Sequence, residues 1–239
     1  MEIKELCDRI TELYENPDIE NQERGLAVRL IYQLQGEIKA EEFSNNDLIP
    51  ILETTTKICS TKRNLKQVLE NELLSLITYL PHKLWMKQSK GKSQYFEKDS
   101  QNREWQIAQS LIDFSKKIYE INLDRDSFAG KRRGYSIQIL ESLSNYFDIP
   151  EFMELCLKSL KSKSKNEFLD SIECLKEYYK EKNIVPTEDV ISIIDKRIEK
   201  TKHRVEATGG LILQVETGLI SELSALSRLD DWKEKNDRW

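Results

Sequence analysis

The chain has 239 residues, of which 33% are charged and 38% are hydrophobic, and it carries only 8 glycines and 5 prolines. A chain of many tight turns needs more of both residues, so this composition argues against a β-sandwich or a propeller and excludes collagen and low-complexity disorder. The formal net charge of −5 is too acidic for wholesale nucleic-acid packaging, although local basic patches can still occur.

Apolar residues recur every three or four positions along most of the chain, which is typical of amphipathic helices. In chain order, the expected helix pairs occupy residues 2–35, 46–80, 100–147, 150–182 and 187–216, and a last helix contains Leu219, Leu223, Leu226 and Leu229. One helix is expected to carry Pro50 near its start, and another to stop before Pro81. Strand-like alternation is missing from the sequence, which therefore predicts an all-α fold of about ten to twelve helices.

A polar segment at about 81–100 interrupts the helical pattern and is expected to be an inserted flexible loop. Its lysines are interleaved with Trp85, Tyr95 and Phe96. Cations mixed with aromatic rings suit base stacking with phosphate contact, and they also suit the anchoring of a protein partner. A solvated loop whose Trp85 packs back onto the helices is the plainer alternative.

The expected helix pairs recur at a nearly constant spacing. Pro150 and Pro186 begin two first helices 36 residues apart, and the last three second helices begin near Lys131, Lys165 and Lys202. This spacing resembles the helix-pair repeats of HEAT and armadillo proteins in architecture. The resemblance implies a right-handed stack of helix pairs, an α-solenoid, with an irregular helical bundle as the alternative.

The four cysteines, Cys7, Cys59, Cys156 and Cys174, are far apart and lie within apolar helical stripes. Without a Cys-x-x-Cys spacing they are expected to be reduced, buried thiols. The first residues lack the basic-then-apolar order of a signal peptide, and no apolar run approaches the ~20 residues that cross a bilayer. We therefore expect a cytoplasmic protein that does not enter a membrane.

Residue types that carry catalysis or bind cofactors are scarce. His82 and His203 are not at metal-ligand spacing, and Gly209–Gly210 lacks the Lys-Ser/Thr of a phosphate-binding loop. The calcium-like start at Asp124 lacks the glycine and glutamate that an EF-hand loop needs. The sequence therefore predicts no catalytic residue, no metal site and no cofactor.

Basic residues gather where the first helix of a pair turns into the second. The candidate partner-binding residues at these turns are Lys131, Arg132, Arg133, Lys163, Lys165, Lys200, Lys202 and Arg204, with Lys161 beside them. Acidic residues gather at the opposite turns, at Glu37, Glu41, Glu42, Asp148, Glu151, Glu188 and Asp189. Turns of one type line up along one edge of a repeat stack, so these cations would form a basic edge that attracts phosphates or an acidic protein surface.

Helix dipoles offer a second explanation of this segregation, because acids at helix N-termini and cations at C-termini each stabilise a helix by about 0.3–1 kcal/mol. The dipole accounts for Glu188 and Asp189. It does not account for Lys131–Arg133 or Arg204, which fall at the start of second helices, where cations are unfavourable. Their placement favours a binding role.

We therefore expect a non-enzymatic adaptor, a single helical-repeat domain over residues 1–239, that binds a protein partner through its concave face and a basic edge. A nucleic-acid-binding HEAT-like protein is the first alternative. A small family of DNA-repair alkylpurine glycosylases with HEAT-like repeats has a similar chain length, but its catalytic residues have no match here. The second alternative is a bacterial immunity or inhibitor protein whose acidic ridge covers a basic toxin surface, which the net charge suits.

Overall fold

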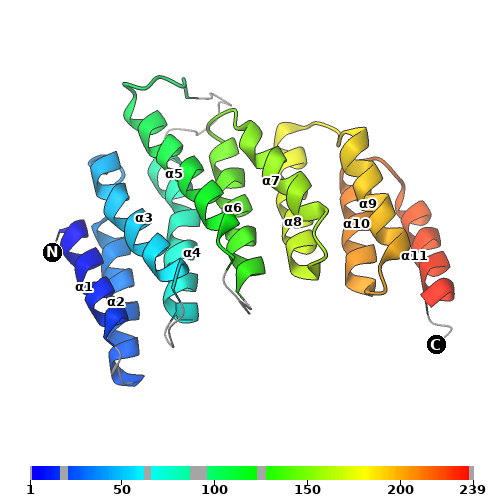
Figure 1. Cartoon of the computed structure of the whole chain (residues 1–239). Helices are drawn as coiled ribbons and strands as arrows, with labels where there is room; N and C mark the ends of the chain where they lie inside the picture. Colours follow the sequence, from blue (N-terminus) through cyan, green and yellow to red (C-terminus); the bar gives the residue numbers. More distant parts are fainter. Residues whose placement is uncertain (1, 17–20, 62–65, 87–95, 123–127, 237–239) are drawn as a thin grey trace. The chain divides into compact units, whose positions relative to one another are not determined.

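The computed structural model describes residues 2–16, 21–61, 66–86, 96–122 and 128–236 (Figure 1). Within these residues the regular structure is entirely α-helical, which confirms the all-α prediction. The helices are α1 (Ile3–Glu15), α2 (Asn21–Glu37), α3 (Asn45–Cys59), α4 (Lys66–Trp85), α5 (Arg103–Glu120), α6 (Ala129–Ser144), α7 (Pro150–Leu160), α8 (Lys165–Lys182), α9 (Glu188–Lys200), α10 (Arg204–Glu216) and α11 (Glu222–Asn236).

The chain divides into two compact units, Met1–Ile149 and Pro150–Trp239. The single helical-repeat domain expected over residues 1–239 stays a prediction. In unit 1, helices α1, α3 and α5 contact one another in succession, and so do α2, α4 and α6. In unit 2, α7 contacts α9, α8 contacts α10, and α11 packs on α10. Within each unit this two-layer order is compatible with a repeat architecture.

Local sequence signals explain several helix starts. Ser164 caps α8, where its hydroxyl accepts the amide hydrogen of Glu167 at 3.4 Å. Ser44 and Asp47 form a capping box at the start of α3. The helices bury aliphatic and aromatic side chains on their inner faces, and all four cysteines are buried free thiols, as predicted.

The predicted stop before Pro81 is wrong, because α4 continues through this proline to Trp85. A proline inside a helix removes one backbone hydrogen bond and usually kinks or ends the helix. Here Leu80, Leu84 and Trp85 are all buried, with exposed fractions between 0 and 3%. Burial of this apolar face outweighs the local cost and keeps the helix intact.

The aromatic candidate Trp85 is part of the core of unit 1, which corrects its place among the partner-binding residues. Its ring centroid lies 5.9 Å from that of Phe96, 5.3 Å from that of Tyr146 and 5.4 Å from that of Phe147. The amide of Phe96 donates to the Tyr146 carbonyl at 2.8 Å, and the Phe96 side chain is half-buried. The plainer alternative for Trp85, packing back onto the helices, is therefore correct.

The loop expected at about 81–100 begins later than its predicted start. Residues 81–85 belong to α4, whereas residues 87–95 lie outside the described part of the chain, and Tyr95 with them. The chain is described again from Phe96 onward, where a short turn leads to the Asn102 cap of α5. The predicted flexibility of the central segment stays a prediction.

In unit 2, α10 approaches its neighbours closely at two glycines. A Cβ atom added at Gly210 would lie 2.9 Å from Cγ2 of Ile194 and 3.0 Å from Cδ1 of Ile198, both on α9. We expect Gly210→Ala to lower the free energy of unfolding by about 1–3 kcal/mol, because the β-branched Ile194 cannot rotate away without moving α9.

Gly36→Ala is the matched control for this prediction. A Cβ atom at Gly36 meets no other atom within 4 Å, so alanine should raise stability there by about 0.4–1 kcal/mol through its higher helix propensity. Urea denaturation followed by circular dichroism compares the two variants. Equal stabilisation by both would show that α10 does not pack tightly on α9.

Candidate functional site

In unit 1, the cationic candidate Arg132 is fully buried, which corrects the expectation that it lies on an exposed edge. Its Nη1 lies 3.2 Å from Oε1 of Glu70 on α4 and donates to the carbonyl oxygen of Cys59 at 3.1 Å. Both charged side chains have an exposed fraction of 0%. Arg132 therefore joins α6 to α3 and α4 and cannot contact a partner in this structure.

The two residues on either side of Arg132 differ in exposure. The Nε of Arg133 donates to the Tyr119 carbonyl at 3.3 Å, and its guanidinium lies 5.7 Å from the centroid of the Tyr119 ring. Arg133 is half-buried and adds a cation at the C-terminal end of α5, where the helix dipole favours one. Lys131 is exposed, with its ammonium 5.3 Å from the Phe128 ring centroid. Lys131 alone of the three is readily accessible.

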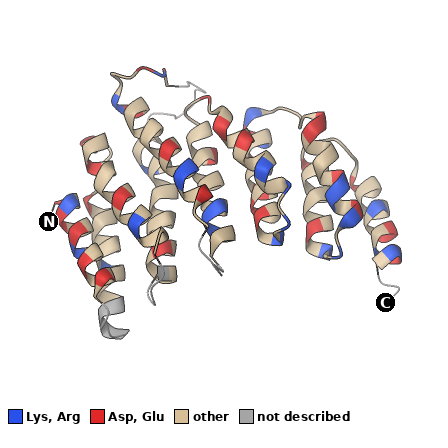
Figure 2. Ribbon diagram, viewed as in Figure 1, with Lys and Arg blue, Asp and Glu red and all other residues tan. Residues whose placement is uncertain are grey.

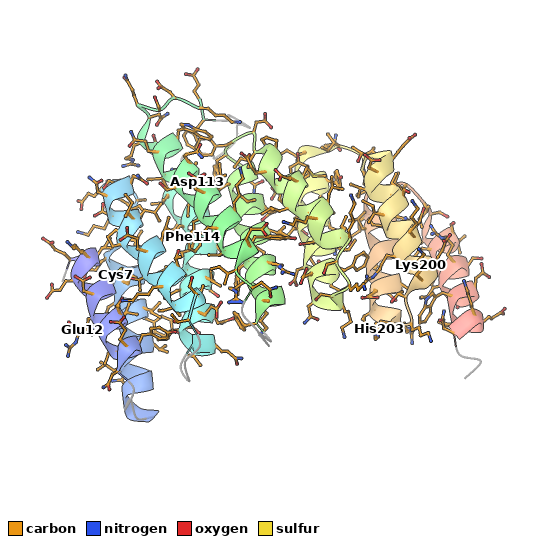
Figure 3. The ribbon with its side chains drawn as sticks, in the orientation of Figure 1. Cys7, Glu12, Asp113, Phe114, Lys200 and His203 are labelled. Atoms are coloured by element: carbon orange, nitrogen blue, oxygen red, sulfur yellow. The ribbon has the colours of Figure 1, made fainter. Side chains whose placement is uncertain are left out.

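In unit 2 the cationic candidates remain on the surface. The turn between α7 and α8 and the turn between α9 and α10 lie at the same end of the unit, at the bottom of the view in Figure 2. We refer to their six exposed cationic side chains as the basic edge: Lys161, Lys163, Lys165, Lys200, Lys202 and Arg204. In Figure 3, Lys200 and His203 mark the α9–α10 turn. The structure thus brings together Lys163, Lys165, Lys200, Lys202 and Arg204.

Arg197 on α9, which the sequence analysis did not single out, holds the two turns together. Its Nη1 donates to the Ser162 carbonyl at 2.8 Å, and its Nη2 lies 2.5 Å from Oε1 of Glu206 on α10. The guanidinium also lies 5.1 Å from the Phe168 ring centroid on α8. Arg197 therefore connects the α7–α8 turn with the first turn of α10.

The carboxylate of Glu206 completes this connection. Burial by itself would raise the pKa of Glu206, but hydrogen bonds from Arg197 and Thr201, together with the charge of Arg197, outweigh it and lower that pKa below its usual value. The indole Nε1 of Trp232 donates to the Thr201 carbonyl at 3.0 Å, which ties the end of α11 to the same turn. Contacts of Arg197, Glu206 and Trp232 thus hold the backbone of the basic-edge turns in place.

The positive charge of the basic edge is not balanced by ion pairs within the part of the chain that the structure describes. None of its six side chains forms an ion pair with another described residue. Glu199 is the only acidic residue among positions 161–166 and 199–204. Helices α8 and α10 both begin at this edge and add the partial positive charge of their N-termini. Lys165 and Arg204 stand in those first turns, where a cation destabilises the helix by about 0.3–1 kcal/mol.

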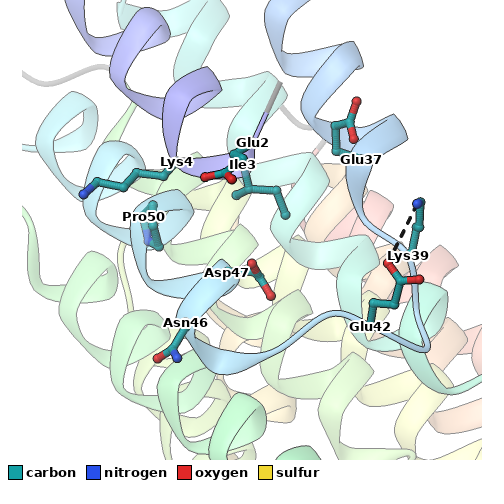
Figure 4. A pocket seen from close by; sticks show the side chains of 9 residues that line it. All are labelled: Glu2, Ile3, Lys4, Glu37, Lys39, Glu42, Asn46, Asp47 and Pro50. Carbon is teal, nitrogen blue, oxygen red and sulfur yellow. Dashed lines mark ion pairs between the residues drawn. The ribbon is translucent and has the colours of Figure 1, made fainter.

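The predicted acidic turns include a polar pocket in unit 1 (Figure 4). Its volume is about 480 Å³, and it lies between the start of α1, the end of α2 and the start of α3. The carboxylates of Glu37 and Glu42 line it, and Lys39 lies 3.8 Å from Glu42. Asp47, also on its wall, accepts the amide hydrogen of Ser44 at 2.9 Å. Because Glu42 has a cation beside it and Asp47 accepts an amide hydrogen, the pocket is a weaker candidate than the basic edge.

Two further properties of the described residues bear on the site. No group of three or more His, Cys, Asp and Glu side chains lies close enough together there to hold a metal ion. Of the helices described, none has both the length and the apolar character to cross a membrane. The chain matches no protein-family model, and no curated protein or solved structure shows significant similarity to it.

Proposed function

We propose that the chain is a helical-repeat adaptor of the cytoplasm that binds an acidic surface of a protein partner through the basic edge of unit 2. The observation that carries the proposal is the set of six exposed cations, without an ion pair in the described part of the chain, on two turns that Arg197 holds side by side. Like-signed charges at this density repel one another unless an anionic partner neutralises them.

Helix dipoles account for only part of this accumulation of charge, such as Lys200 in the last turn of α9. Two of the cations, Lys165 and Arg204, occupy first helical turns, where acidic residues would be more stabilising. By contrast, the buried Arg132 in unit 1 has a structural partner in Glu70. Two cations that cost stability, in a set without an ion-pair partner among the described residues, support a role in binding rather than in folding.

A protein partner is favoured over nucleic acid by the other side chains of the edge. Single-stranded nucleic acids are bound by cations together with exposed aromatic rings on which bases stack. Between residues 161–166 and 199–205, the sequence contains no Phe, Tyr or Trp, and Val205 is the exposed apolar residue, with an exposed fraction of 52%. An aliphatic residue among cations suits a protein surface that combines acidic and apolar groups.

A charge-reversal pair tests this proposal. The probes are a fluorescein-labelled, glutamate-rich peptide of about 15 residues and a single-stranded oligonucleotide of equal charge. We expect Lys165→Glu with Lys202→Glu to weaken peptide binding by about tenfold or more, as measured by fluorescence anisotropy. The variant should melt at the same temperature as the unmodified protein or slightly higher, because Glu at position 165 favours the dipole of α8.

The matched control reverses the same number of charges away from the edge, at Lys117 and Lys196, both exposed. This control should bind the peptide nearly as well as the unmodified protein. Equal weakening by both double variants would show that peptide binding depends only on the net charge of the protein, and it would contradict the proposal. Tighter binding of the oligonucleotide, with a steep linear fall of log affinity against log salt, would establish the nucleic-acid alternative instead.

A further inference from the structure

The last helix of unit 2 leaves an apolar groove open. The groove lies between α10 and α11 and has a volume of about 460 Å³. Ile212 and Val215 line it from α10, and Leu226 and Leu229 line it from α11. Leu226 and Ile212 have exposed fractions of 57% and 41%. An exposed aliphatic surface of this kind, enclosed by polar residues, is typical of a binding groove.

The packing inside unit 2 indicates which kind of element this groove accepts. Helix α10 lies against both α8 and α9, so closely that a Cβ atom at Gly209 would be 3.1 Å from Leu169 on α8 and one at Gly210 would be 2.9 Å from Ile194 on α9. Helices α10 and α11 have the same chain order as α8 and α9, a second helix followed by the first helix of the next pair. The groove is therefore the place where a further second helix would pack.

Two carboxylates of the groove indicate which charge a helix bound there would carry. Glu216 and Glu222 line the groove where α10 turns into α11. Glu222 is exposed, and Glu216 has a single described cation nearby, Lys176 at 3.7 Å. Helices α8 and α10 run in the same direction, because Arg197 connects their N-terminal ends. A helix that packs as α10 does would end beside Glu216 and Glu222, where lysine or arginine in its last turn also favours its own dipole.

We propose that the groove between α10 and α11 binds an amphipathic helix of a partner protein, with apolar residues at helical spacing and Lys or Arg in its last turn. This site is separate from the basic edge and does not depend on the function proposed above. Apolar side chains of the bound helix lie between Ile212 and Leu226, and its terminal cations pair with Glu216 and Glu222.

Designed peptides test the site directly. The probe is a fluorescein-labelled helical peptide of about 16 residues, roughly 24 Å long, with leucines along one face and two lysines in its last turn. A second peptide has glutamates in place of those lysines. We expect the lysine peptide to bind about tenfold more tightly than the glutamate peptide in fluorescence anisotropy. Equal affinity for the two peptides would show that the two carboxylates do not select the occupant.

The chain offers a matched pair of variants on α11. Leu226 lines the groove, whereas Leu223, one turn earlier and 79% exposed, does not. Leu226→Ser should weaken binding of the lysine peptide by about tenfold or more, and Leu223→Ser should change it little. Because both side chains are largely exposed, both variants should keep the melting temperature of the unmodified protein. Equal effects of the two substitutions would overturn the proposal.

Glu222→Lys provides a second, independent variant. It should reverse the preference so that the glutamate peptide binds more tightly, while basic-edge variants should leave the preference unchanged. Sedimentation velocity tests the competing occupant, a second copy of this chain. A dimer at micromolar concentration that Leu226→Ser dissociates and Leu223→Ser preserves would assign the groove to self-association and overturn the proposal of a partner helix.

Discussion

Replacing Arg132 by methionine should lower the free energy of unfolding by about 3–5 kcal/mol. The substitution removes the cation that lies 3.2 Å from the Glu70 carboxylate, in a site where both side chains have an exposed fraction of 0%. It also removes the hydrogen bond from Arg132 to the Cys59 carbonyl, which connects α6 with the end of α3. Urea denaturation followed by circular dichroism measures the loss.

The double variant Glu70→Leu with Arg132→Met separates the cost of removing Arg132 beside a buried carboxylate from the net value of the pair. Apolar residues of similar volume can replace a buried ion pair with little loss or with a gain, so the double variant should recover most of the stability. Arg133→Met, at a half-buried position, should cost only about 1 kcal/mol. If Arg132→Met costs no more than Arg133→Met, the buried pair does not stabilise unit 1.

Replacing Arg197 by methionine should destabilise unit 2 by about 2–4 kcal/mol. The guanidinium donates to the Ser162 carbonyl at 2.8 Å and pairs with Glu206, whose side chain is 2% exposed. Loss of the guanidinium leaves the buried carboxylate of Glu206 without the cation of Arg197, and it releases the α7–α8 turn from α10. Because the same contacts hold the basic edge together, the variant should also bind the acidic peptide more weakly at temperatures where it stays folded.

The Arg197–Glu206 pair also makes unit 2 sensitive to acid. The pKa of Glu206 is lowered in the folded protein, so its carboxylate contributes stability that is fully present above the ordinary glutamate pKa of about 4.3. This contribution is lost as the pH falls through the lowered folded pKa. Thermal melts between about pH 7 and pH 3 should therefore show a decline that is smaller in Glu206→Gln, which has no charge to titrate. An identical decline in both proteins would show that other groups govern the acid response.

The helices and their pairing could be predicted from the sequence because apolar periodicity is a local signal. The stripes that predicted pairs at 150–182 and 187–216 correspond to α7–α8 and α9–α10, and the second helix expected near Lys165 begins there. The burial of the cysteines followed from the same stripes. Pro81 was misjudged because the helix continues for a reason that is not local, namely the burial of Leu84 and Trp85.

The roles of the arginines could not be predicted from the sequence because their partners are distant along the chain. Arg132 and Glu70 are separated by 62 positions, and Arg197 and Ser162 by 35. A buried cation and an exposed cation look the same in a basic run such as Lys131–Arg133. In unit 2 the prediction of adjacent basic turns depended only on the order of the helix pairs, because turns of one type line up along one edge of a repeat stack, and there the structure brings the candidates together.

Lysine footprinting in the presence of the acidic peptide tests the basic edge most directly. Acetylation of surface lysines is followed by mass spectrometry with and without the glutamate-rich peptide at saturating concentration. The proposed function predicts several-fold slower acetylation of Lys163, Lys165, Lys200 and Lys202, with unchanged rates at Lys117 and Lys196, which are exposed elsewhere. Equal protection of all six lysines, or protection confined to the two control positions, would contradict a binding site at the basic edge.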